Sequence, residues 1–190
     1  MPKIVDHEQY RRQLLQQSFD LFAEKGYGSI TMRQIAKGLA VSTGTLYHYF
    51  PSKEILFEQL VEELERQDML QVTEQLQTAQ TLSDRLMVGF EFLEKHRHYF
   101  FKQLLIYLDF YQHQDRESST GTLIFQQMGK RVRARIAEMF DIHDPEILDF
   151  ILSFVDGLLV SHLYYPDGVS FVQQGKLLTK MLTIYLEDKE

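Results

Sequence analysis

The chain has 190 residues, 44% of them hydrophobic, which suffices for one large globular domain or two small ones. It contains no run of 18 uninterrupted apolar residues, and its first residues lack the apolar core of a signal peptide. We therefore expect a cytoplasmic protein that has no membrane partner. The absence of cysteine excludes disulfides and thiolate–zinc sites.

The net charge of −7 is distributed unevenly along the chain. Residues 1–53 hold 7 Lys and Arg against 4 Asp and Glu, a balance of +3. Residues 54–190 hold 13 against 23, a balance of −10. A general nucleic-acid coat protein would be basic throughout, whereas the basic footprint of this chain is local and lies near the N-terminus.

Hydrophobic periodicity and capping signals predict three short helices at the N-terminus. The first covers residues 6–25 and stops at Gly26. Thr31 opens the second, and Gln34 three positions later predicts a capping box. The third runs from residue 42 or 43 to residue 50. Three short helices with a tight turn between the second and the third predict a helix-turn-helix unit.

The rest of the chain also shows helical patterns and no period-2 alternation, so we predict an all-α fold of about nine helices. Asp144 before Pro145 is typical of a helix N-cap followed by proline at the first helical position. The six further helices are expected at residues 53–78, 83–96, 97–114, 120–140, 145–165 and 170–187, the first of them after a cap at Ser52.

The segment VSTGTLYHYFPSKEILF, residues 41–57, contains the most informative pattern. A DNA major groove admits small, hydroxylated and aromatic side chains at the front of a short helix, and phosphates attract a lysine that opens the next one. Gly44 would permit close approach of the backbone. The candidate DNA-contact residues of this segment are Thr43, Gly44, Thr45, Tyr47, His48 and Lys53.

Two residues of the second helix join these candidates. Thr31 caps that helix and is also expected to contact a phosphate, and Arg33 is the most plausible cation for reading a base. Simpler interpretations exist for two of the third helix's residues. Instead of contacting DNA, the ring of Tyr47 would pack on neighbouring helices, and the side chain of His48 would be exposed to solvent without a partner.

Residues 14–57 resemble the DNA-binding domain of the tetracycline-repressor (TetR) family of bacterial transcriptional regulators. The matching stretches lie in residues 21–27, 31–36 and 41–56. One position departs from the family, which usually has glycine where this chain has Ala40. That turn position often requires a left-handed backbone, which costs a non-glycine residue roughly 1 kcal/mol or more.

The resemblance implies a helix-turn-helix DNA-binding domain in residues 1–52 and a helical effector-binding and dimerisation domain in residues 53–190. It further implies a homodimeric repressor that binds a palindromic operator in double-stranded DNA. An unknown small-molecule effector would release that DNA. The alternative is a DNA-binding regulator without such an effector, which would act constitutively, as an activator, or by recruiting a protein.

The C-terminal region is rich in aromatic residues, most of which belong in a core or an interface. An apolar effector pocket would be lined by Tyr107, Tyr111, Met128 and His162, although Met128 would serve equally well as core filler. Two apolar stripes on the last two helices are expected to form the dimer interface, or else to close only the subunit's own core. Their residues include Ile151, Phe154, Leu158, Leu178, Met181, Leu182 and Tyr185.

Nothing in the sequence indicates an enzyme. It has no glycine-rich phosphate loop, no nucleophile elbow and no paired metal motif. His96 and His98 are two positions apart, which places them on different faces of a helix, and His143 lies in what is expected to be a solvated acidic turn. We therefore expect no catalytic residues, no cofactor and no metal.

Overall fold

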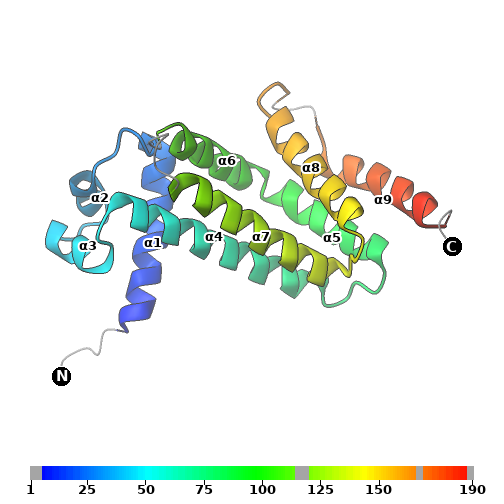
Figure 1. Cartoon of the computed structure of the whole chain (residues 1–190), viewed down its shortest axis with the longest axis horizontal. Helices are drawn as coiled ribbons and strands as arrows, with labels where there is room; N and C mark the ends of the chain where they lie inside the picture. The colour runs from blue at the N-terminus through cyan, green and yellow to red at the C-terminus, as the bar shows by residue number, and fades with distance from the viewer. Residues whose placement is uncertain (1–5, 114–119, 166–168, 188–190) are drawn as a thin grey trace. The chain divides into compact units, whose positions relative to one another are not determined.

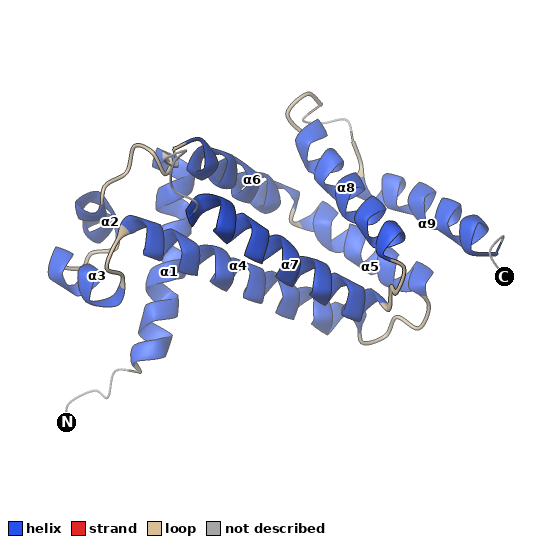
Figure 2. Cartoon of the chain, in the orientation of Figure 1, coloured by secondary structure: helices blue, strands red, loops and turns tan. Residues whose placement is uncertain are grey.

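The computed structural model describes residues 6–113, 120–165 and 169–187 of the chain (Figure 1). Within these ranges it contains helices and connecting loops but no strand, which confirms the all-α prediction (Figure 2). The helices of the described residues are α1 (His7–Lys25), α2 (Met32–Gly38), α3 (Thr43–Tyr49), α4 (Lys53–Leu76), α5 (Leu82–Lys95), α6 (Arg97–Gln112), α7 (Thr120–Phe140), α8 (Pro145–Ser161) and α9 (Phe171–Glu187).

Side-chain caps fix where several of these helices begin. Thr31 accepts from the backbone N–H of Gln34, whose side chain in turn accepts from the N–H of Thr31, so the predicted capping box is confirmed. Asp144 caps α8 with Pro145 in its first turn, also as predicted. The end of α8 differs from the prediction. It stops at Ser161 rather than at residue 165, because the next residues form turns.

The chain divides into two compact units, and α4, α6 and α7 contribute residues to both. The first unit extends to residue 67 and includes residues 105–128. The second comprises residues 68–104 and 129–190. The division into functional domains after residue 52 is a separate matter and stays a prediction.

In the first unit, α2 and α3 are too short to form a core of their own. Each therefore buries one face together with α1 and the start of α4. Solvent is excluded from the following large side chains of this unit: Leu14, Phe22, Ile30, Ile35, Leu46, Phe50, Leu56, Phe57 and Phe110. This core fixes the helix-turn-helix on the N-terminal half of α4.

In the second unit, α5 packs against α9, and α8 completes the core. Four residues predicted for the dimer interface lie in that core, namely Ile151, Leu158, Leu178 and Leu182, and Phe154 is packed against it. The side chains of these residues therefore pack within the subunit, and their part in a dimer interface stays a prediction. Met181 and Tyr185 are exposed. No helix of the described ranges is long and apolar enough to cross a membrane.

Candidate nucleic-acid interface

The turn between α2 and α3 contains the left-handed residue that its position suggested. Ala40 has φ of 55°, and its N–H donates to the carbonyl of Lys37 over 3.2 Å. The N–H of Val41 donates to the carbonyl of Ala36 over 3.0 Å. These two bonds form a Schellman motif, which satisfies the last carbonyls of α2. The turn therefore keeps its geometry, and Ala40 carries the strain that glycine would avoid.

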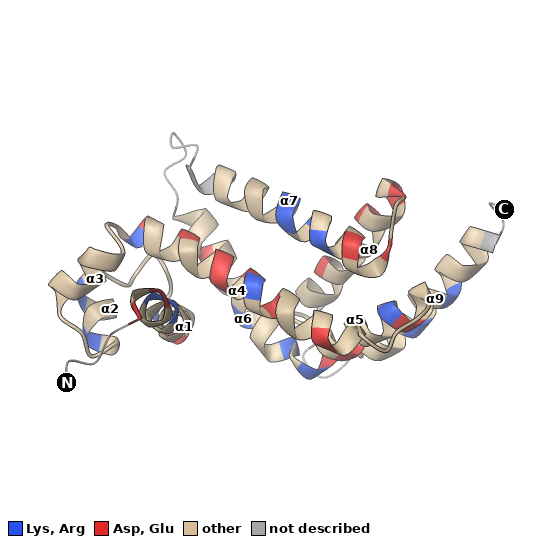
Figure 3. Ribbon diagram, turned by 90° about the horizontal axis from the view of Figure 1, so that it is seen from below, with Lys and Arg blue, Asp and Glu red and all other residues tan. Residues whose placement is uncertain are grey.

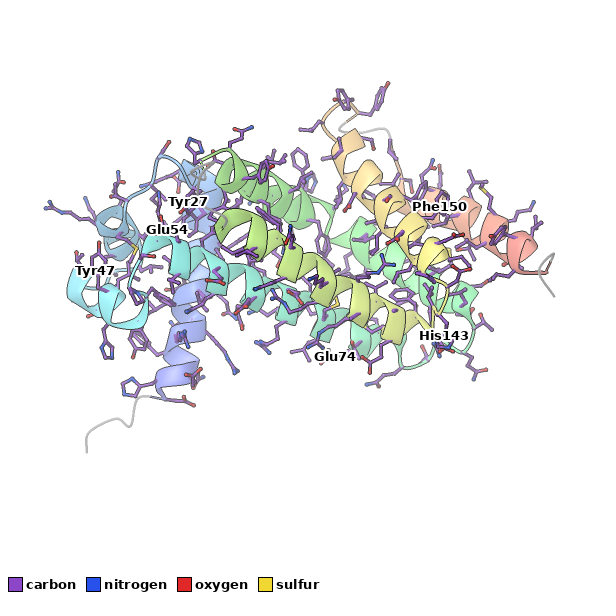
Figure 4. All side chains as sticks on the ribbon, in the orientation of Figure 1. Tyr27, Tyr47, Glu54, Glu74, His143 and Phe150 are labelled. Atoms are coloured by element: carbon purple, nitrogen blue, oxygen red, sulfur yellow. The ribbon has the colours of Figure 1, made fainter. Side chains whose placement is uncertain are left out.

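The helix that follows divides cleanly into a buried and an exposed side. Leu46 is completely buried, whereas Thr43, Gly44, Tyr47 and His48 are exposed (Tyr47 is labelled on α3 in Figure 4). These four positions recur at spacings of three and four, so they share one face of α3. That face presents hydroxyl, backbone, phenol and imidazole groups to solvent, with the N-terminus of the helix at one end.

Thr45 is the least accessible of the predicted α3 contacts. Ser42 caps the helix by accepting from the N–H of Thr45 over 2.9 Å. The two side-chain oxygens are 2.8 Å apart and share a hydrogen bond. A contact between Thr45 and DNA would therefore have to add to this cap or replace part of it. Ser42 itself is exposed beside it and was not among the predicted contacts.

The start of α2 adds two exposed side chains to the same helix-turn-helix. The hydroxyl of Thr31 donates to Oε1 of Gln34 over 2.8 Å, so a contact with phosphate would come in addition to its role in the cap. Arg33 is exposed one residue into the helix. Contacts of both residues with DNA stay predictions.

Lys53 has an internal role that the sequence did not reveal. Its ammonium group donates to the backbone carbonyls of Tyr27, at 2.7 Å, and Ile30, at 3.1 Å. It also lies 4.2 Å from the centre of the Tyr27 ring. Burial lowers the pKa of Lys53, while the carboxylates of Glu54 and Asp109 act in the opposite direction. Because two of the three ammonium protons are used in these hydrogen bonds, only one remains for a contact with phosphate.

Tyr27 lies at the centre of this arrangement. Its hydroxyl donates to Oε1 of Glu54 over 3.2 Å, and both residues are labelled in Figure 4. Burial acts to raise the pKa of Glu54. Hydrogen bonds from its own backbone, from Ser52 and from Tyr27 have the larger combined effect and lower the pKa. Tyr27 and Glu54 thereby connect α4 with the loop that leads into α2.

Charge is unevenly arranged over the first unit (Figure 3). Exposed basic side chains occur at Lys25, Arg33 and Lys37, near or on α2. The first half of α4 carries several glutamates instead, including the exposed Glu62. Like charges repel, so the glutamates of α4 disfavour DNA along that helix and favour it at α2 and α3.

The four residues predicted for an effector pocket are divided between the two units. Tyr107 and Tyr111 of the first unit both contact the ring of Phe125, with centroid distances of 5.9 and 6.2 Å. Met128 is half-buried in the same unit. His162 belongs to the second unit, where its ring contacts Phe101 at 4.9 Å. Their role in binding an effector stays a prediction.

A hollow of the second unit lies between the start of α5 and the end of α9, and none of the predicted pocket residues lines it. Leucines and hydroxyl side chains form its walls. Within residues 6–113, 120–165 and 169–187, no group of three or more His, Asp or Glu side chains is arranged to hold a metal ion.

Known sequences resemble this chain mainly over the helix-turn-helix. The profile of the family described as "Bacterial regulatory proteins, tetR family" matches residues 14–60. The regulator UidR of Escherichia coli K12 is 41% identical over 51 residues, which are 27% of this chain and 26% of UidR. The repressor KstR2 of Mycolicibacterium smegmatis is 34% identical over 103 residues, 52% of this chain and 48% of KstR2. The chain thus spans about a quarter to a half of these relatives' length.

Solved structures share the fold over nearly the whole chain. The fatty acid degradation regulator FadR of Bacillus halodurans aligns with a TM-score of 0.73 at 17% identity, over 90% of this chain and 93% of FadR. GusR of Salmonella enterica aligns with a TM-score of 0.70 at 23% identity, over 97% and 99%. Residues 14–60 thus match the helix-turn-helix domain of the tetR family of bacterial regulatory proteins, and the described residues share the fold of these solved structures.

Proposed function

We propose that this chain is a transcriptional regulator, and not an enzyme, that acts in the cytoplasm by binding double-stranded DNA through α2 and α3. The observation that carries the proposal is the exposed face of α3, where Thr43, Gly44, Tyr47 and His48 project from a helix whose other side is anchored by Leu46. A short helix held in this way has the dimensions and the polar surface that a major groove accepts.

Salt dependence of binding tests this mode of contact. Each phosphate that the protein neutralises contributes about 0.9 to the slope of log affinity against log salt concentration. A titration of fluorescently labelled duplex between low and physiological salt should give a steep negative slope. Binding that is indifferent to salt would argue against phosphate contacts from Lys53 and the other cationic side chains of this surface.

A homodimer is the second part of the proposal. Apolar side chains on the outer face of α9 are exposed at the helical spacing of four and three residues: Leu177, Met181 and Ile184, with Tyr185 beside them. On α8, Phe150 and Val160 are exposed, and a Cβ atom placed on Gly157 would meet no other atom within 4 Å. Apolar faces of two neighbouring helices, paired with their copies around a two-fold axis, would form a four-helix interface.

The dimer matters to DNA binding because a single DNA-binding head, the helix-turn-helix of one subunit, contacts only a few base pairs. Two heads related by a two-fold axis would bind an operator whose half-sites form a palindrome. Light scattering of the purified protein measures the mass directly. A mass of twice 22.5 kDa supports the proposal, whereas a monomer at micromolar concentration removes it.

Release by a small molecule is the third part. Among structures of similar fold, one regulator from Saccharomonospora viridis was solved with choline and FadR from Bacillus subtilis with stearoyl-CoA. Tyr107, Tyr111 and Met128 are the proposed contacts of such a molecule in the first unit, and a role for His162 of the second unit is a separate prediction. A screen for compounds that release labelled operator tests this part. If no compound releases it, the regulator without a small-molecule effector is the better description.

A further inference from the structure

The loop between α1 and α2 is enclosed by α4 on one side and by the end of α6 on the other. Tyr27, the second residue of this loop, is 3% exposed. Its ring contacts Phe57 of α4 at 5.1 Å and Phe110 of α6 at 4.7 Å, both edge to face. Since α2 begins only a few residues further on, whatever fixes this loop also fixes the first helix of the helix-turn-helix.

The contact from α6 is polar as well as aromatic. Oδ2 of Asp109 accepts a hydrogen bond from the backbone N–H of Gly28 over 3.1 Å. Oδ1 of the same carboxylate is 3.1 Å from Nδ1 of His113, which lies one turn further along the chain. Asp109 therefore connects the loop to the end of α6 through one oxygen, and His113, whose Nδ1 is also 2.9 Å from the backbone carbonyl oxygen of Asp109, lies beside the other.

Both glycines of the loop leave room for this contact. Gly26 has φ of +76°, and a Cβ atom at that position would lie 2.9 Å from Oδ2 of Asp109. A Cβ atom on Gly28 would lie 2.4 Å from Nε2 of His113. The side chains of Asp109, in α6, and of His113, directly after α6, thus occupy the space that side chains of the loop would need, and the backbone of the loop lies against them.

We propose that Asp109 and His113 are positioning residues for DNA binding, which hold the loop of residues 26–30, and with it α2, in the orientation that the operator requires. The inference rests on the proposed DNA-binding function. Lys53 holds the same loop from the α4 side, through the carbonyls of Tyr27 and Ile30. The loop is therefore held from two sides, by Lys53 of α4 and by Asp109 of α6. We call these two sets of contacts the clamp.

Loss of the clamp should lower affinity without removing any DNA contact. A head that occupies its binding orientation for only part of the time binds with an apparent affinity reduced by that fraction. Asp109→Ala removes the acceptor for the Gly28 N–H, and we expect operator binding to weaken by about tenfold. Asp109→Asn keeps an acceptor oxygen and should recover most of the lost affinity. Gln112→Ala, an exposed change on the same helix, is the control and should bind as the unchanged protein does.

Three readouts separate positioning from other roles. The slope of log affinity against log salt should be the same in Asp109→Ala and the unchanged protein, because no phosphate contact is lost. Circular dichroism should show the same helix content. Hydrogen exchange in the absence of DNA should quicken in residues 26–38 of Asp109→Ala but not of Gln112→Ala. Unchanged exchange there would overturn the proposal whether or not an operator is known.

A second pair of variants tests the contact from the side of the loop. Gly28→Ala places a methyl group against the His113 ring and should weaken operator binding, whereas adding His113→Ala makes room for it and should recover part of the loss. Additive effects of the two changes, or full binding by Gly28→Ala, would refute the clamp. If the unchanged protein bound no DNA sequence selectively, the proposed function would be wrong. The hydrogen-exchange comparison would still test whether Asp109 holds the loop.

Discussion

Replacing Asp68 by Asn should stabilise the protein above pH 6. Asp68 lies on α4 in the second unit and is 7% exposed. Its carboxylate accepts from Nε2 of Gln103 over 2.9 Å and interacts with the Tyr99 hydroxyl, but no Lys, Arg or His of the described residues pairs with it. Burial raises its pKa from 3.8 to about 6, because the two neutral hydrogen bonds only partly offset the loss of water.

The sign and size of the effect follow from linkage. A carboxyl whose pKa is higher in the folded state binds its proton more tightly there, so the folded state loses stability as the pH rises from about 4 to about 6. The loss is complete above that range and absent below it. A shift of about two units corresponds to about 3 kcal/mol, as an order of magnitude. Asparagine keeps the shape and an acceptor oxygen without the charge, so we expect a gain of about 1–3 kcal/mol at pH 7.5.

Urea unfolding at half-unit steps from pH 4 to pH 8, followed by the helical signal in circular dichroism, measures this difference. Asp20→Asn, the same change at an exposed site of α1, is the control and should alter stability little at any pH. The reasoning is refuted if Asp68→Asn differs from the unchanged protein by a constant amount across this range. It is refuted equally if the variant is less stable at pH 7.5.

Four further outcomes are expected. Tyr47→Ala should weaken operator binding by about 1–3 kcal/mol and leave the unfolding curve unchanged, since the ring is exposed; equal affinity would remove Tyr47 from the interface. Ala40→Gly should raise the free energy of unfolding by up to about 1 kcal/mol, because its φ of 55° strains alanine, and a loss of stability would contradict this. Lys53→Ala should weaken binding to all DNA sequences, reduce the salt slope by about one and also lower the melting temperature, because the carbonyls of the α1–α2 loop lose their donor. Met181→Glu should give monomers in light scattering and Lys176→Glu should not; dimers in both would exclude the outer face of α9 as the interface.

Features that depend on neighbouring residues could be predicted from the sequence. Thr31 and Gln34 form their capping box within one turn, and Asp144 caps α8 through residues two and three positions on. The left-handed backbone at Ala40 was expected only through the resemblance, from the glycine that the family usually has at this position. Such features are decided by a few adjacent dihedral angles and hydrogen bonds, so their signals stand in the sequence itself.

Features that join distant parts of the chain could not be predicted. Gly28 and Asp109 are 81 positions apart, and nothing around either residue indicates the other. The carbonyl acceptors of Lys53, in Tyr27 and Ile30, also become its neighbours only in the folded unit. The sequence therefore indicated only a phosphate contact for this lysine. Periodicity found the apolar stripes of α8 and α9 but could not tell which side faces inward. Leu178 is buried and Met181 is exposed, although both belong to one predicted stripe.

Selection from random duplex DNA at near-physiological salt tests the central claim most directly, namely that the exposed face of α3 reads a specific sequence. The account predicts enrichment of a palindromic sequence by the unchanged protein and loss of that enrichment in Tyr47→Ala. The spacing of the half-sites would then give the distance between the two heads. Retention of DNA without enrichment of any sequence would contradict the claim and leave only a non-specific electrostatic contact.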